Sequence, residues 1–576
     1  MRFRYVQLFI FLLGILLPSF VLAQTINLEN IGKTTKEALR KNPFKISGGI
    51  SSNMVFYASS QEQYREPFTY FLNGNINIGL YKWTLPISYS FTNQGSQLDY
   101  KIPWDFNRLS LSPKYKWVQA YLGDVSMAFS PYTYNGLTFR GVGLELTPEI
   151  PLKVSLMSGR LNKAVEEDGN AQTLATYQRM GYGTNLRWEK QKYKIGFIFF
   201  YAKDDMYSIK TPIDNKGIYP QENLVLSGKF SAFVHKNIEI FTELSHSSLT
   251  QDLRAEKSKE NSKKRMFFFA ENSTTQHFMA YNAGIHFTLN NTALGVKYER
   301  IDPEYKTLGA YYFNNDLENI TLQTQFNLWK DKVTLSANIG RQIDNLEKQK
   351  QKSTNRWVAD VSANIKASEK LMITTSYSNF TMFTNSQLNA FEAINKNPLH
   401  IQQPKDSIDF KQISQNVNFS LNYILSSSEN CSQNINMNYS LNDMVSKENE
   451  VVRKGGISRF HNLMVAYSVS FPKKKLNASF FTNVTHSYAN SQKAMQWGPS
   501  FTVNKLFLED KLQTSFGASY NASSGDILME AINFTAGANY SLWEKHQFSI
   551  NFMQLIRKQQ ASFNETNATI GYSYRF

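Results

Sequence analysis

Residues 568–576 read ATIGYSYRF, and this closing stretch of the chain decides the fold class. Its alternate positions share one face of an extended strand, and they are mostly large and apolar: Ala568, Ile570, Tyr572, Tyr574 and Phe576. The opposite face holds Thr, Gly, Ser and Arg. A strand with one apolar and one polar face fits a wall that separates lipid from a water-filled lumen.

The same period of two recurs along the chain. Residues 532–542 alternate apolar with small or polar side chains, and residues 320–328 set Gln323, Gln325 and Asn327 opposite an apolar face. An amide placed in a dry core without partners loses about 2–7 kcal/mol. Because water in a lumen would satisfy these amides, the pattern predicts barrel strands rather than a soluble sandwich.

The connections between the predicted strands fall into two classes. Short turns occur near 188–190, 235–237, 289–291, 329–332, 367–369, 472–474, 508–510 and 543–545. Longer polar stretches lie near 203–223, 249–273, 302–317, 345–355, 384–409 and 446–454. Short turns on the periplasmic side and long loops on the outside are typical of outer-membrane barrels. Counting between connections predicts about seven strands up to Arg160 and about 19 from Arg179, which gives about 26 strands in a range of about 22–26.

Large aromatic residues stand at several strand ends on the short-turn side: Trp188, Trp329, Phe507 and Trp543. Aromatic side chains gather in this way at the interface between a bilayer and water. Aromatics make up 14% of the 576 residues, with 31 Tyr and 42 Phe, whereas charged residues make up only 19%. This composition also favours a membrane barrel.

The first residues predict export. Arg2 and Arg4 precede an apolar run over 8–17, and the small or apolar residues 21–23 come just before Gln24, so residues 1–23 are expected to be a cleaved signal peptide. Residues 24–43 would form a short periplasmic segment, and 44–576 the barrel. A segment of this length has no room for the plug domain of TonB-dependent receptors, which the sequence therefore argues against.

No motif for catalysis stands out. There is no Gly-x-Ser-x-Gly elbow or phosphate-binding loop, and the eight His residues show no metal-ligand spacing, so no enzyme activity, metal or cofactor is expected. The single Cys431 excludes an internal disulfide. A net charge of +16 could suit nucleic acid, but the membrane topology argues against that partner.

Alternation within the predicted strands puts six basic residues on lumen faces: Arg140, Lys153, Arg187, Lys194, Lys229 and Lys297. An excess of positive charge there would favour anionic solutes or acidic polymers. The alternative is that these side chains pair locally or contact lipid headgroups near the rims.

Residues 93–135 alternate weakly and contain three Pro residues, as well as Trp104. A barrel of this predicted size is wide, and wide barrels are usually plugged. We therefore expect part of 93–135, together with 384–409, to fold inward and constrict the lumen.

Two local features resemble known families of outer-membrane barrels. The last strand resembles the signal that hands such proteins to the barrel-assembly machinery, and Tyr572, Tyr574 and Phe576 would carry it. The turns at Trp329–Lys332 and Leu508–Lys511 resemble those of large, mostly uncharacterised barrels of Bacteroidota-type bacteria.

A third resemblance lies nearer the N-terminus. YLGD at 121–124 and TFRGV at 138–142 are loosely similar to early barrel strands of chaperone-usher secretion pores. The usher's separate plug and its flanking periplasmic domains have no counterpart in this sequence.

The sequence thus predicts an all-β fold, a single large antiparallel transmembrane β-barrel in the bacterial outer membrane. The expected function is a passive or partner-gated channel or translocation conduit for a bulky or anionic substrate, without covalent chemistry. Expected partners are outer-membrane lipids and lipopolysaccharide, the assembly machinery, and a periplasmic or surface protein. Two alternatives remain open: a non-conducting surface adhesin or assembly scaffold, and a barrel hydrolase with an unrecognised site.

Overall fold

The computed structural model describes residues 44–576 except 61–64, 94–106, 170–172, 215–216, 257–268, 291, 311–314, 349–354, 380–409, 449–450, 490, 527 and 560–561. The predicted signal peptide, the segment 24–43 and the stretch 384–409 lie outside the described residues. Within the described ranges, no helix is long and apolar enough to cross a membrane.

One antiparallel sheet contains all the described strands, and its members follow the chain order. The strands are β1 (Phe44–Ser59), β2 (Phe68–Leu80), β3 (Trp83–Thr92), β4 (Arg108–Leu111), β5 (Lys114–Tyr115), β6 (Val118–Ala128), β7 (Asn135–Leu146), β8 (Leu152–Asn162), β9 (Gln178–Glu189), β10 (Tyr193–Asp205), β11 (Glu222–His235), β12 (Ile238–Thr250), β13 (Thr275–Leu289), β14 (Thr292–Ile301), β15 (Leu317–Leu328), β16 (Val333–Asp344), β17 (Asn355–Lys366), β18 (Leu371–Ser378), β19 (Phe410–Ser427), β20 (Ser432–Glu448), β21 (Val451–Phe471), β22 (Leu476–Ala489), β23 (Gln492–Phe507), β24 (Leu512–Gly525), β25 (Met529–Leu542), β26 (His546–Lys558) and β27 (Ser562–Arg575). A 3₁₀ turn, η4 (Pro472–Lys474), joins β21 to β22.

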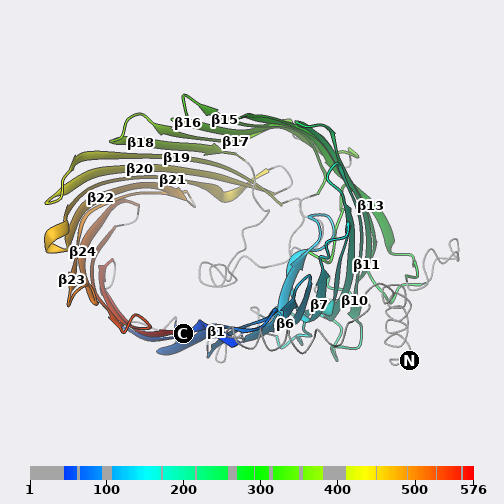
Figure 1. Ribbon diagram of the computed structural model, residues 1–576, viewed down its shortest axis with the longest axis horizontal. Coiled ribbons are helices and arrows are strands. Elements are labelled where there is room, and N and C mark those ends of the chain that lie inside the picture. Colours follow the sequence, from blue (N-terminus) through cyan, green and yellow to red (C-terminus); the bar gives the residue numbers. More distant parts are fainter. Residues whose placement is uncertain are drawn as a thin grey trace, which may run out of the picture.

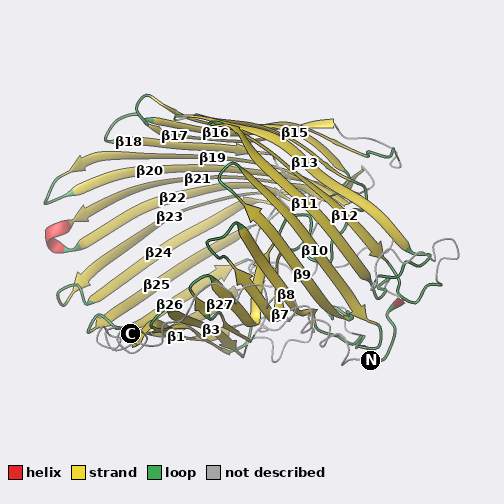
Figure 2. Cartoon of the chain, turned by 45° about the vertical axis from the view of Figure 1, so that its right-hand side comes forward, coloured by secondary structure: helices red, strands yellow, loops and turns green. Residues whose placement is uncertain are grey.

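The sheet closes on itself because β1 pairs with β27, as the neighbouring positions of β1 and the C-terminus show in Figure 1. The backbones of Gly48 and Phe576 exchange hydrogen bonds of 3.1 and 3.2 Å, which completes the last turn of the ladder. Closure leaves no strand edge, so every strand finds backbone partners on both sides. In Figure 2 the strands run obliquely across the wall, as closure of a barrel requires.

The strands form a barrel of 26, since β4 and β5 both pair with β3 and β6 and act as two halves of one interrupted strand. The predicted all-β, single-barrel fold and the predicted strand number are confirmed. Seven strand positions precede residue 163, and the strands from β9 to β27 make up the rest.

The two faces of the wall follow from the register, because directly paired residues on neighbouring strands share a face. One face carries exposed aromatic and aliphatic side chains, among them Phe197, Phe480, Trp497, Phe516 and Phe548. The opposite face carries Asn, Ser, Thr and most of the charged residues of the strands. An exposed apolar face around the whole barrel identifies the outside of the wall.

The short turns use left-handed backbone conformations without glycine. Trp329, Lys330 and Asp331 have φ of 52, 56 and 64°, and Leu508 and Trp543 begin similar turns at 52 and 50°. These tight turns reverse the chain within a few residues, and they place Trp329 and Trp543 at the rim, where their side chains are 74 and 76% exposed. We call this rim the short-turn end, and the opposite rim the long-loop end.

Candidate functional site

The interior of the barrel is occupied on one side by two connections that fold inward. Residues 129–135 join β6 to β7, and residues 302–309 begin the connection from β14 to β15. We call 129–135 and 305–309 the inner shelf. Their backbones are joined by a hydrogen bond of 2.9 Å from Asn135 N to Gly309 O, and Thr307 Oγ1 donates to Thr133 O at 2.5 Å. In Figure 1 the chain around β6 and β7 leans towards the wall formed by β10–β13.

Apolar packing holds the shelf against the wall. The ring of Tyr134 is fully buried and stacks on Phe200 of β10, with ring centres 5.4 Å apart. Leu308 from the second connection joins the same cluster. Gly309 is required here, because a Cβ atom would lie 2.4 Å from Thr133 O and 2.9 Å from the Phe200 ring. The cluster is Val125, Met127, Phe129, Tyr134, Leu137, Phe139, Met157, Leu161, Ile198, Phe200, Ala202, Val225, Leu249 and Leu308.

A buried carboxylate on β12 anchors the first connection. Glu243 accepts hydrogen bonds from the hydroxyl of Ser130 and, at 3.0 Å, from that of Ser227 on β11. Lys229 lies beside it, with Nζ 3.5 Å from Glu243 and 3.0 Å from the Phe129 carbonyl oxygen, to which it donates. A charged pair on the wall, Glu243 and Lys229, therefore forms hydrogen bonds with Ser130 and Phe129 of the shelf.

A second anchor lies on β13 and β14. Tyr132 donates its hydroxyl proton to Glu299 and accepts a hydrogen bond of 2.9 Å from Asn282 Nδ2. Tyr305 in turn donates to the Tyr132 carbonyl oxygen at 2.8 Å, which ties the two connections together. Burial raises the pKa of both tyrosines above its ordinary value, and the nearby carboxylates of Glu299 and Glu243 act in the same direction.

The range 93–135 was expected to contribute an inward-folded constriction, and the structure places its last part, 129–135, in the shelf. Residues 107–128 of that range instead belong to the wall or its turns, and 94–106 lie outside the described residues. The partner of 129–135 is the stretch 302–309, for which the sequence predicted only a long polar loop. Tyr305 and Leu308 in this stretch could have indicated that it packs inside the barrel, because a loop surrounded by water has no need of large aromatic and aliphatic residues.

Five of the six predicted basic residues lie on the inner face. Lys229 and Lys297 stand at mid-height, whereas Lys153, Arg187 and Lys194 lie near the short-turn end. The mid-height pair is neutralised locally, because Lys297 Nζ lies 2.9 Å from Glu299 and Lys229 lies beside Glu243 as described. Local pairing therefore accounts for the cations in the middle of the barrel.

Arg140 lies on the outer face of β7, in contrast to the expectation that it lines the lumen. It pairs with Asp124 of β6, with Nε 2.7 Å from Oδ1, and shares its face with the exposed Val142. The neighbouring Phe139 points inward into the shelf cluster. Alternation assigned the wrong face because the shelf buries apolar side chains on the inside of β7, so the rule that polar side chains face the lumen is inverted there.

The wall opposite the shelf is polar and uncharged. Among the described side chains of β18–β25, those on the inner face include no Asp, Glu, Lys or Arg. One row crosses the strands in register: Ser376, Asn418, Ser440, Asn462, Thr485, Gln496 and Ser523. These amides and hydroxyls bond to one another, as in the 2.8 Å contact from Asn462 Nδ2 to Thr485 Oγ1. The inner surface on this side is a hydrogen-bonding lining without fixed charge.

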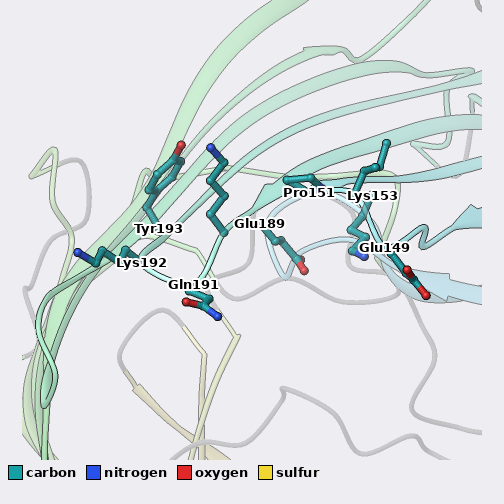
Figure 3. Close-up of a pocket in the computed structure, with 9 residues that line it drawn as sticks. Glu149, Pro151, Lys153, Glu189, Gln191, Lys192 and Tyr193 are labelled. Atoms are coloured by element: carbon teal, nitrogen blue, oxygen red, sulfur yellow. The ribbon is translucent and has the colours of Figure 1, made fainter. Parts of the chain in front are cut away.

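A hollow of about 640 Å³ opens at the short-turn end, between the turn from β7 to β8 and the turn from β9 to β10 (Figure 3). Its lining combines apolar and charged side chains: Glu149, Ile150, Pro151, Lys153, Glu189, Lys190, Gln191, Lys192 and Tyr193. Glu189 lies 3.4 Å from Arg187, and Lys153 Nζ donates to the Pro148 carbonyl oxygen. Lys190 and Lys192 are exposed at the tip of the turn.

The residues of the predicted assembly signal lie together on the outer face at the closing seam. Tyr572 Oη lies 2.9 Å from His546 Nδ1, and the Tyr574 ring contacts both His546 and Phe576, at 4.6 and 5.6 Å between ring centres. Their role in assembly stays a prediction. In the described part of the chain, no group of three or more His, Cys, Asp or Glu side chains is placed to hold a metal ion.

The comparisons with known proteins found similarity to solved structures only. No family model matches the chain, and no curated protein matches it. Among solved structures, the P pilus usher (PapC) translocation pore is 12% identical, with a TM-score of 0.37 over 92% of this chain and 98% of that one.

Two further structures have similar values. A chain of the E. coli P pilus tip assembly intermediate PapC-PapD-PapK-PapG is 12% identical, with a TM-score of 0.44 over 92% of this chain and 60% of that one. Acinetobacter baumannii OccAB2 is 10% identical, with a TM-score of 0.28 over 67% of this chain and 97% of that one. At these values the likeness is one of barrel architecture alone.

Proposed function

We propose that this protein is an outer-membrane conduit that passes bulky hydrophilic substrates along its uncharged wall, and that it acts without covalent chemistry. The observation that carries the proposal is the closed barrel whose outer face is apolar and whose inner face on β18–β25 is a lining of amides and hydroxyls. Such a lining exchanges hydrogen bonds with a polar solute or with water without trapping it by charge.

The inner shelf supports a conduit of regulated width. It occupies one side of the interior and is held by two separate polar anchors, at Glu243 and Glu299, in addition to the stacked ring of Tyr134. Because these contacts are made by loops rather than by strands, their release would leave the ladder of the wall intact. The position of the shelf, docked or released, would then set the largest width of substrate that can pass.

The sequence predicted selectivity for anions along the lumen, but fewer of the basic residues are available to attract anions in this arrangement. The mid-height lysines are paired with carboxylates, so among the described residues the excess of basic over acidic side chains on the inner face lies towards the short-turn end, at Lys194 and its neighbours. The conduit would therefore admit anions preferentially at one mouth rather than along its whole length.

The test is electrical. The full chain is reconstituted into planar bilayers, and unit conductance is measured with neutral dextrans of increasing size on one side. We expect open channels that small dextrans enter and larger ones do not, with a higher size limit after the shelf is released by Gly309→Ala. A barrel that stays silent both with and without that substitution would overturn the proposal.

A second candidate function is presentation of a surface platform. At the long-loop end, Tyr177, Ile209 and Ile213 from two connections are buried together in a small apolar cluster. Arg254 from a third connection lies 2.9 Å from Asp214 and stacks over the ring of Tyr219. Ordered loops of this kind suit a non-conducting adhesin or scaffold, and a silent but correctly folded barrel would favour that function.

A further inference from the structure

We propose that the hollow at the short-turn end docks an acidic polypeptide segment from the periplasm, which carries apolar side chains among its carboxylates. The inference rests on the proposed function in one respect, since an outer-membrane barrel turns its short turns towards the periplasm. It adds a partner and a site that the conduit itself does not require.

Basic residues outnumber acidic residues on the inner rim of the short-turn end. Strand ends that face the interior at this end carry mostly basic residues: Lys45, Lys114, Lys153, Arg187, Lys194, Lys366 and Arg575. Acidic residues on the same inner rim are fewer: Glu145, Glu189 and Glu239. Of these acids, Glu145 accepts a hydrogen bond of 2.8 Å from Tyr121, and Glu189 lies beside Arg187. A polyanion approaching this mouth meets an excess of cations.

The second step is the shape of the rim. The hollow between the two turns in Figure 3 is a recess in that rim, and Lys190 and Lys192 from the turn between β9 and β10 are among the residues that line it. Both side chains are exposed, and Lys190 Nζ lies over the rings of Trp188 and Tyr193, 5.8 and 5.9 Å from their centres. Because both ammonium groups face water, each can bind a carboxylate, and Lys190 can do so while it stays over the aromatic rings.

The third step concerns the chemistry of the occupant. Ile150, Pro151 and Tyr193 give the hollow an apolar part beside its lysines, and Ile150 is 46% exposed. An extended polypeptide can offer a carboxylate and an apolar side chain within a few residues, whereas a uniformly charged polysaccharide cannot fill both parts.

The test uses the full chain in detergent micelles and two fluorescein-labelled peptides of equal length and equal Glu content, one with Leu and one with Ser between the acids. Binding is followed by fluorescence anisotropy. We expect the Leu-containing peptide to bind more tightly, and Lys190→Glu with Lys192→Glu to weaken its binding by about tenfold or more. The matched control is Lys473→Glu with Lys474→Glu, which makes the same change of charge at another short turn.

Several outcomes would overturn the inference. Equal loss in the control pair would mean that the site is the general charge of the rim, and equal binding of polygalacturonate would mean that the hollow does not favour a polypeptide. Binding only to phosphatidylglycerol vesicles would assign the lysines to lipid. Peptide binding by a barrel that conducts nothing would leave the docking site standing and reject the conduit, so the two proposals fail separately.

Discussion

Ser130 and Glu243 meet inside the barrel although 113 positions separate them in the chain, and the Ser130 hydroxyl donates its proton to the Glu243 carboxylate. Glu243 is 7% exposed and stands on β12, whereas Ser130 belongs to the connection between β6 and β7. Removing one partner of a buried charged group costs about 3–5 kcal/mol, because the remaining charge is left uncompensated. Glu243 is therefore one of the two wall carboxylates that hold the shelf, together with Glu299.

The substitution Glu243→Gln is expected to loosen the shelf. It keeps the size of the side chain but removes the charge that supports the hydrogen bonds from Ser130 and Ser227, each worth about 1.5–3 kcal/mol when charged. We expect a larger unit conductance or more frequent opening in planar bilayers. Glu239→Gln, on the same strand and face but away from the shelf, is the control. Unchanged conductance in Glu243→Gln would contradict the anchoring role.

The substitution Gly309→Ala tests the close approach of the two connections. A methyl group there would collide with the Thr133 carbonyl oxygen and the Phe200 ring, so one connection must move away. We expect overpacking to lower the free energy of unfolding by roughly 1–3 kcal/mol, seen as a lower midpoint of thermal unfolding, together with raised conductance. Gly228→Ala is the matched control, since a Cβ at Gly228 meets no atom within 4 Å. Similar behaviour of the two variants would reject the packing argument.

Alkaline pH is expected to undock the shelf. The pKa values of Tyr132 and Tyr305 are raised in the folded protein, mainly by burial, so the phenols stay protonated where an unfolded tyrosine would ionise. The stabilisation they contribute is complete below the unfolded pKa of about 10 and is lost as the pH rises above it. Conductance measured from neutral to strongly alkaline pH should increase above that value. In Tyr132→Phe, which is already neutral at all pH values, this increase should be smaller.

A measurement of ion selectivity should distinguish charges on the inner face of the barrel from charges on its outer face. Lys194→Glu places a negative charge on the inner rim, and we expect the reversal potential in a salt gradient to shift towards cation preference. Arg140→Gln removes a charge from the outer face of β7, and it should leave the reversal potential unchanged. A shift caused by Arg140→Gln would show that this side chain faces the conducting path after all.

The C-terminal residue is expected to support closure and assembly. Deleting Phe576 removes the backbone pair with Gly48 and the contact with the Tyr574 ring at the seam between β1 and β27. We expect less folded barrel in the membrane, measured as the fraction that migrates in the compact form on unheated gels. Phe576→Tyr keeps the aromatic ring and the backbone, and it should assemble normally. Equal fractions of folded barrel for the deletion variant and the intact chain would contradict the predicted role of Phe576 in assembly.

The sequence by itself determined the barrel, its strand number and most of its faces. Alternation is a local property, because successive side chains of a strand point to opposite sides, and residues such as Ile570 and Phe534 mark the outer face wherever they occur. Closure follows from the need of every strand for hydrogen-bonded neighbours on both sides. These constraints act strand by strand and need no knowledge of distant contacts.

Only the tertiary structure decided what lies inside. The hydrogen bond from Tyr305 to the Tyr132 carbonyl joins positions 173 residues apart, and no periodicity in either connection announces it. The packing of the shelf against the wall decided the face of Arg140, since Leu137 and Phe139 of β7 point inward into the apolar cluster around Tyr134 and reverse the usual alternation. Local pattern sets which residues share a face, but which loop fills a wide interior depends on complementary side chains brought together by the closed wall.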